Sequence, residues 1–220
     1  SHEPGRLPRC WGDIGDNIFI LSKWLQLTVL ITAALVRWVP PLTAAIPGPT
    51  WFGAAVAVPL VSVVMPVRNG GEWLREAVGS ILGQSLRDLE LILVDDHSDD
   101  GAIGGLPRND ARLTVMQSAG RGVSDAFNTG LAHSRGRYVA RMDADDIALP
   151  HRLEIQLAYL AAHSDVAICG GCVELFAANG LAGGNRRYQS WLNACRTPAA
   201  IRREIFIESP IPNPTALFRR

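Results

Sequence analysis

The chain has 220 residues, enough for one domain with a sizeable core, and 48% of them are hydrophobic, which excludes an intrinsically disordered protein. Lysine plus arginine and aspartate plus glutamate number 21 each, so the chain lacks the net positive charge that is typical of nucleic-acid-binding proteins. Its four cysteines are too few for a disulfide-stabilised scaffold and indicate a reducing compartment.

Residues 1–58 differ in composition from the rest of the chain. They contain four of the six tryptophans, several prolines and an apolar run over residues 18–38. The uninterrupted part of this run is shorter than the roughly 20 apolar residues that span a bilayer. We expect a hydrophobic N-terminal extension that forms a helix docked on the domain or is disordered, with membrane association through residues 18–38 as an alternative. Because the chain starts without a methionine and stops in a strand-like run, we also expect it to be a fragment of a longer protein. A further alternative is that some of residues 1–58 are non-native sequence.

From residue 60 onward, short apolar runs alternate with amphipathic segments. Residues 60–66 form a continuous β-branched run, which is typical of a buried parallel strand. Leu74, Ala77, Val78 and Ile81 follow at the spacing of one helix face. By the same criteria, strands are predicted over residues 60–66, 89–94, 113–116, 138–142 and 165–169, and helices over residues 74–82 and 123–131 and from about residue 150. This alternation predicts an α/β fold with a mainly parallel sheet flanked by helices.

Three segments with polar side chains lie at the carboxyl ends of predicted strands. They are Met65 to Asn69, Asp95-Asp96, and Asp143 to Asp146. Right-handed crossovers place the carboxyl ends of parallel strands at one edge of a sheet, and ligands of open α/β sheets bind outside that edge. We therefore expect these three segments to form one site.

The segment after the strand over residues 138–142 holds three carboxylates within four residues: Asp143, Asp145 and Asp146. Adjacent carboxylates repel one another and raise each other's pKa unless a cation is shared. Mg²⁺ or Mn²⁺ is the natural partner, since these ions take one or two carboxylates together with substrate phosphates. Taken alone, the cluster fits equally well a solvated acidic turn that caps the helix beginning near Pro150.

Two other spacings imitate metal sites. The segment from Asp96 to Gly101 resembles the start of a calcium loop, but Pro107 occupies the position of the bidentate glutamate. Cys169 and Cys172 have the spacing of a zinc or redox motif, but no second Cys/His pair accompanies them, so we expect core packing.

The motifs taken in order resemble those of family 2 glycosyltransferases. The resemblance covers roughly residues 60–220 and does not extend to residues 1–58. It is carried by the segments Val61 to Asn69, Ser80 to Ser85, Leu91 to Asp100, Ala126 to Leu131, Asp143-Ala144-Asp145-Asp146 and Pro150 to Leu153. It implies that residues 59–220 form a GT-A domain, a Rossmann-like fold that binds a nucleotide-diphosphate sugar and transfers the sugar with inversion.

The resemblance also implies roles for single residues. The nucleotide pocket would be lined by Pro66, Val67, Arg68 and Asn69. The imide N–H of the base would be bound by Asp96, with Asp95 beside it, and the diphosphate would be contacted by Arg121. Asp143 and Ala144 would lie near the ribose, Asp145 would be the principal ligand of Mn²⁺ or Mg²⁺, and Asp146 would assist the metal or cap the next helix.

The implied donor is a UDP- or dTDP-sugar, and the acceptor is a glycan, a lipid-linked molecule or a protein. Inversion needs a general base, and in this family that carboxylate follows the segment resembled by residues 209–219, so we expect it beyond Arg220. Since nucleotide sugars are made in the cytosol, we expect a cytoplasmic protein, with the inner face of the membrane as an option. A donor-binding domain without turnover is one alternative. A nucleotidyltransferase-like enzyme is another, although residues 66–71 lack the lysine of its usual phosphate loop.

Overall fold

The computed structural model describes residues 19–22 by their backbone, and residues 58–107, 109–176 and 181–220 in full. The strands are β1 Phe19–Ser22, β2 Val61–Val67, β3 Leu89–Asp95, β4 Leu113–Gln117, β5 Tyr138–Arg141, β6 Ile147–Ala148, β7 Ile168–Cys169, β8 Cys172–Leu175 and β9 Leu217–Arg219. The α-helices are α1 Leu74–Leu82, α2 Val123–His133, α3 Arg152–Ala162, α4 Gly183–Ala194 and α5 Pro198–Glu204, and the 3₁₀ helices are η1 Ala102–Gly105 and η2 Asn213–Thr215.

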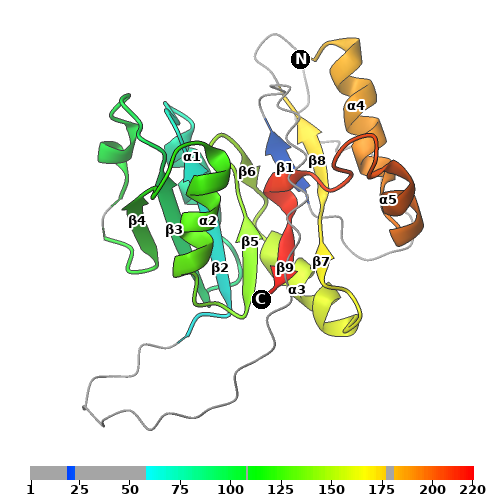
Figure 1. The fold of residues 1–220 in the computed structure, drawn as a ribbon, viewed down its shortest axis with the longest axis horizontal. Helices are drawn as coiled ribbons and strands as arrows, with labels where there is room; N and C mark the ends of the chain where they lie inside the picture. Colours follow the sequence, from blue (N-terminus) through cyan, green and yellow to red (C-terminus); the bar gives the residue numbers. More distant parts are fainter. Residues whose placement is uncertain (1–18, 23–57, 108, 177–180) are drawn as a thin grey trace, which may run out of the picture.

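A six-stranded sheet in the order β4-β3-β2-β5-β9-β7 forms the centre of the domain (Figure 1). Strands β4, β3, β2 and β5 are parallel, whereas β9 is antiparallel to both β5 and β7. The prediction of a mainly parallel α/β sheet is therefore confirmed. The chain proceeds from β2 outward to β3 and β4 and then returns to place β5 on the other side of β2. This reversal creates a topological switch point at the carboxyl ends of β2 and β5.

Helices cover both faces of this sheet. All seven residues of β2 are buried, and its alternate residues contact opposite layers. Leu74, Ala77, Val78 and Ile81 of α1 are buried in the same core cluster as α3 residues on one face, which confirms the predicted helix. On the other face α2 lies very close to the sheet at Gly130, where a Cβ atom would be 2.5 Å from Val64 Cγ1.

A second, three-stranded sheet has the order β6-β1-β8. Strand β1 is antiparallel to β6 and parallel to β8. Residues 19–22 are thus a strand, not part of the docked helix that we expected for the N-terminal extension. The rest of the apolar run over residues 18–38 lies outside the described residues. Within the described part of the chain, no helix is both long and apolar enough to cross a membrane.

The C-terminal third differs most from the sequence-based prediction. The strand expected over residues 165–169 is reduced to Ile168–Cys169, and the chain passes at Gly170 into β8 of the other sheet. Only glycine fits at this crossing, because a Cβ atom would lie 2.6 Å from Ile211 Cγ2. Helices α4 and α5 were not predicted. Helix α4 is mostly polar and buries little beyond Leu192.

Candidate functional site

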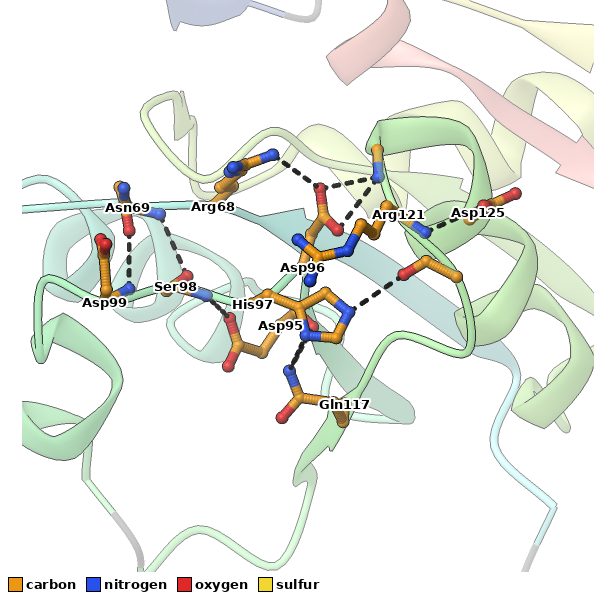
Figure 2. Close-up of polar contacts among 12 residues, drawn as sticks. Arg68, Asn69, Asp95, Asp96, His97, Ser98, Asp99, Gln117, Arg121 and Asp125 are labelled. Carbon is orange, nitrogen blue, oxygen red and sulfur yellow. Dashed lines mark hydrogen bonds and ion pairs between the residues drawn. The ribbon is translucent and has the colours of Figure 1, made fainter.

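Asp96 is a buried carboxylate directly after β3, with 3% of its surface exposed. Both of its oxygens accept hydrogen bonds from the backbone N–H of Gly122, at 3.0 and 2.9 Å, and Arg68 Nη1 lies 4.0 Å from Asp96 Oδ2 (Figure 2). Gly122 has a φ of 91°, a conformation that other residues rarely adopt. The chain therefore fixes the orientation of this carboxylate between the loops that follow β2 and β4, where its remaining lone pairs can accept from a ligand N–H.

The loops after β2 and β3 are joined by reciprocal hydrogen bonds. The backbone N–H of Asn69 donates to Ser98 Oγ at 3.0 Å, and the N–H of Asp99 donates to Asn69 Oδ1 at 2.9 Å (Figure 2). Asn69 has a φ of 53°, in the left-handed region that asparagine tolerates better than most residues. The N–H groups of Gly71 and Ala102 bind the carboxylate of Asp100 and lower its pKa.

Asp95 has a different environment from Asp96. Its Oδ1 accepts the backbone N–H of Ser98 at 2.8 Å, so this side chain stabilises its own loop. His97 continues the loop with a φ of 57°, and its Nε2 lies 3.3 Å from the carbonyl oxygen of Gly120. The contact connects the loop after β3 to the loop that carries Arg121. Arg121 is exposed and its side chain is directed toward Asp96 (Figure 2).

The acid loop, Asp143 to Asp146, follows β5 at the same edge of the sheet. Val64 of β2 pairs with Arg141, and the N–H of Met142 donates to Val64 O, so Asp143 lies level with the end of β2. Arg141 Nε donates to Asp143 Oδ1 at 3.1 Å. Asp143 and Asp145 are half-buried, Ala144 is 9% exposed and Asp146 is 2% exposed.

The acid loop does not supply the N-cap residue of the next helix. Helix α3 begins at Arg152, its N-cap residue is His151, and the His151 side chain makes no capping hydrogen bond. Asp146, for which a capping role was considered, is thus not at the N-cap position. The three predicted segments, Pro66 to Asn69, Asp95-Asp96 and Asp143 to Asp146, thus follow adjacent strands at one sheet edge.

Arg152 is a residue near the acid loop to which sequence reasoning assigned no role. Its side chain is 1% exposed and is the largest of the fully buried side chains in the described chain. Burial lowers the pKa of Arg152 to about 10, although Asp146, Cys169 and Asp143 act in the opposite direction. The only signal in the sequence was the segment Pro150 to Leu153, which matched the family pattern without indicating burial.

The acid loop can supply only some of the ligands of a divalent cation, and other groups must complete the coordination shell. Among the described residues, no three His, Cys, Asp or Glu side chains are arranged to hold a metal ion by themselves. In nucleotide sites, Mg²⁺ is typically held by one or two carboxylates together with phosphate oxygens and waters. Asp145 and its neighbours supply hard oxygen donors of that kind.

The two cysteines of the predicted spacing lie in different strands. Cys169 of β7 is buried and Cys172 of β8 is half-buried. Burial raises the pKa of the Cys169 thiol to about 11, which disfavours the thiolate that binds metals and attacks disulfides. Core packing accounts for Cys169.

Comparison with known families agrees with this geometry. The model of glycosyl transferase family 2 matches residues 62–220, well over half of the chain. The chain belongs to glycosyl transferase family 2. Two Bacillus subtilis relatives, EpsE and EpsJ, are named as glycosyltransferases. EpsE is 36% identical over 130 residues, which cover 57% of this chain and 47% of EpsE. EpsJ is 40% identical over 92 residues, which cover 40% of this chain and 27% of EpsJ. This family 2 chain therefore spans less than half the length of these curated relatives.

Solved structures show the same fold. The mannosyltransferase PcManGT from Pyrobaculum calidifontis, solved in complex with GDP-Man and Mn²⁺, has a TM-score of 0.51 and 25% identity, and the match covers 75% of this chain and 46% of that chain. TarS residues 1–349 from S. aureus have a TM-score of 0.52 and 21% identity, over 72% of this chain and 46% of that chain. PcManGT is a mannosyltransferase, and both similarities support the GT-A fold expected here.

Proposed function

We propose that this family 2 domain binds a nucleotide-diphosphate sugar at the edge formed by the carboxyl ends of β2, β3 and β5. In the whole protein, the sugar passes from this donor to an acceptor hydroxyl with inversion at the anomeric carbon. The observation that carries the proposal is the orientation of Asp96, a buried carboxylate beside the loop that follows β2.

Asp96 is proposed to bind the base of the donor. A carboxylate accepts the single imide N–H of uracil or thymine, and we therefore propose a UDP- or dTDP-sugar. Arg68 is 59% exposed in its side chain and lies beside Asp96, where its planar guanidinium can stack on a base that reaches the carboxylate. Pro66, Val67 and Asn69 would line the same pocket. PcManGT was solved with a guanine nucleotide, so the test below includes GDP as a competitor.

The acid loop is proposed to hold the diphosphate through a divalent cation. Asp145, assisted by Asp146, would be the protein ligand, and Asp143 and Ala144 would lie near the ribose. Bound Mn²⁺ or Mg²⁺ supplies positive charge that stabilises the departing diphosphate. Arg121 would add a second positive group to the same phosphates, because it is exposed and directed toward Asp96 (Figure 2).

Calorimetry with UDP, dTDP and GDP, each with and without Mn²⁺, tests this proposal. We expect UDP or dTDP to bind more tightly than GDP and to require the metal. The variant Asp145→Ala should lose the metal dependence, whereas Asp165→Ala, which removes an exposed aspartate after α3, should keep it. Equal nucleotide affinity with and without Mn²⁺ in the unmodified chain would refute the metal role. The acceptor and the transfer step remain proposals for the whole protein.

A further inference from the structure

Arg152 places a permanent positive charge in the interior of the domain, next to the acid loop. Burial of a cation is costly unless hydrogen bonds and opposite charges compensate for it. Arg152 is 1% exposed, and its position at the first turn of α3 is set by the family-like segment Pro150 to Leu153. A structural role alone would be served at lower cost by an apolar side chain of similar size.

The contacts of Arg152 are directed at the start of the acid loop. Its Nη2 donates to the carbonyl oxygen of Arg141 at 2.9 Å, and its Nη1 lies 3.4 Å from Met142 Sδ. Its Nε donates to Gln156 Oε1 at 3.2 Å. Arg141 and Met142 are the two residues that directly precede Asp143. Arg152 thus fixes the point at which the acid loop leaves β5.

Two carboxylates of the acid loop act on the charge of Arg152. Burial lowers the pKa of its guanidinium, and Asp146, Cys169 and Asp143 act in the opposite direction. Arg141 is paired with Asp143, and its guanidinium lies over the ring of Phe127. Arg152 and Arg141 thus both place positive charge beside the acid loop.

We infer that Arg152 is a positioning residue for the metal site: it acts as a built-in counter-cation that holds Asp143 to Asp146 in place and lowers their intrinsic affinity for a divalent cation. This inference rests on the function proposed above. The positive charge of Arg152 opposes the binding of a free divalent cation to the loop. The diphosphate of a donor contributes the missing negative charge, so metal and nucleotide bind together and not in sequence.

The test is the Mn²⁺ dissociation constant, measured from the electron paramagnetic resonance signal of free Mn²⁺, without nucleotide. Arg152→Gln is expected to tighten Mn²⁺ binding by at least about tenfold, because in an effective dielectric of about 20 the repulsion between the guanidinium and a divalent ion is twice that for a monovalent ion. Arg152→Lys keeps the charge but not the three contacts, so it should lower the melting temperature and change this constant much less than Arg152→Gln does.

Arg219→Gln is the matched control. Arg219 also donates to backbone carbonyls, those of Val166 and His163, but it pairs with Tyr138 at the opposite end of β5. Its loss should lower the melting temperature without changing Mn²⁺ binding. A purely structural Arg152 would behave in the same way as Arg219.

A second route to the same charge change is Gln156→Glu, which keeps Arg152 packed but places a carboxylate on its Nε. If Arg152→Gln does not fold, Gln156→Glu must still tighten Mn²⁺ binding. If a folded Arg152→Gln or Gln156→Glu variant has an unchanged Mn²⁺ dissociation constant while the unmodified chain binds UDP in a Mn²⁺-dependent way, the inference about Arg152 is wrong and the proposed function still stands. If the unmodified chain binds no Mn²⁺ with or without UDP, the metal role in the proposed function fails as well.

Discussion

Replacing Glu90 by glutamine is expected to lower the free energy of unfolding by about 2–3 kcal/mol at neutral pH. Glu90 is 6% exposed, near the amino end of β3. Its carboxylate accepts the hydroxyl of Ser62 at 2.6 Å, and Arg135 donates to it from Nε at 2.9 Å and from Nη2 at 2.6 Å. The backbone N–H of Arg135 adds a further bond at 2.9 Å.

The expected loss of unfolding free energy depends on whether Arg135 can be hydrated once residue 90 is neutral. A hydrogen bond to a charged group contributes about 1.5–3 kcal/mol, and breaking a fully buried ion pair costs about 3–5 kcal/mol. Arg135 is 50% exposed in its side chain and can be hydrated when its partner is neutral. The loss should therefore be close to that of one charge-assisted bond and below that of a fully buried pair.

The effect of Glu90→Gln should also depend on pH. Burial raises the pKa of Glu90, but the bonds from Ser62 and Arg135 together outweigh it and hold the pKa below its usual value. Since the pKa is lower in the folded than in the unfolded state, the stabilisation is fully present above the unfolded pKa of about 4.3 and is lost as the pH falls through the folded pKa. The difference between variant and unmodified chain should shrink in acid.

Urea unfolding followed by tryptophan fluorescence, between neutral pH and about pH 3, measures this difference. Glu154→Gln is the control, because Glu154 also accepts a serine hydroxyl at 2.6 Å, from Ser85, but on an exposed surface. It should cause no measurable change. A loss below about 0.5 kcal/mol for Glu90→Gln, or a difference that persists undiminished in acid, would refute the reasoning.

Three further predictions concern single side chains. Gly130→Ala should lower the stability measured in thermal melts by about 1–3 kcal/mol, because the added methyl group overpacks the core. Gly79→Ala, where an added methyl group meets nothing within 4 Å, should raise the stability by up to about 1 kcal/mol. Similar effects at both sites would contradict this prediction. Asp96→Asn should weaken UDP binding at least about tenfold in calorimetry with little change in melting, because the amide loses the charge that strengthens the bond to the base; an exposed control, Asp99→Asn, should bind normally. Asn69→Ala should be about 1 kcal/mol less stable than Asn69→Gly in urea titrations, because the φ of 53° suits glycine; equal stability would argue against strain at this position.

Buried periodic segments were predictable from the sequence. The helix expected over residues 74–82 has those bounds in the structure, because its apolar positions are the ones that α1 buries. β2 and β3 were found within one residue, since central parallel strands are apolar on both faces. The arrangement of polar segments at one sheet edge then followed from topology alone.

Elements that depend on distant partners were not predictable. Strand β6 has two residues and exists because β1 pairs with it. Helix α4 buries little of its surface, so its sequence lacks a clear apolar stripe. In the site, the sequence indicated Asp96 and the acid loop by residue type. The Gly122 contact of Asp96 and the burial of Arg152 arise from long-range packing, which no local pattern records.

The two ends of β2 and β3 differ in what their polar groups accomplish. At the amino end, Ser62 and Glu90 form a closed network whose donors and acceptors are satisfied within the protein. At the carboxyl end, Asp96 keeps acceptor capacity next to an exposed arginine, and the acid loop places three carboxylates at the same edge of the sheet. Polar groups with unused capacity cost stability unless a ligand uses it. Changes at the amino end should therefore alter melting without altering nucleotide affinity, and nucleotide with Mn²⁺ should raise the melting temperature only while Asp96 and Asp145 are intact.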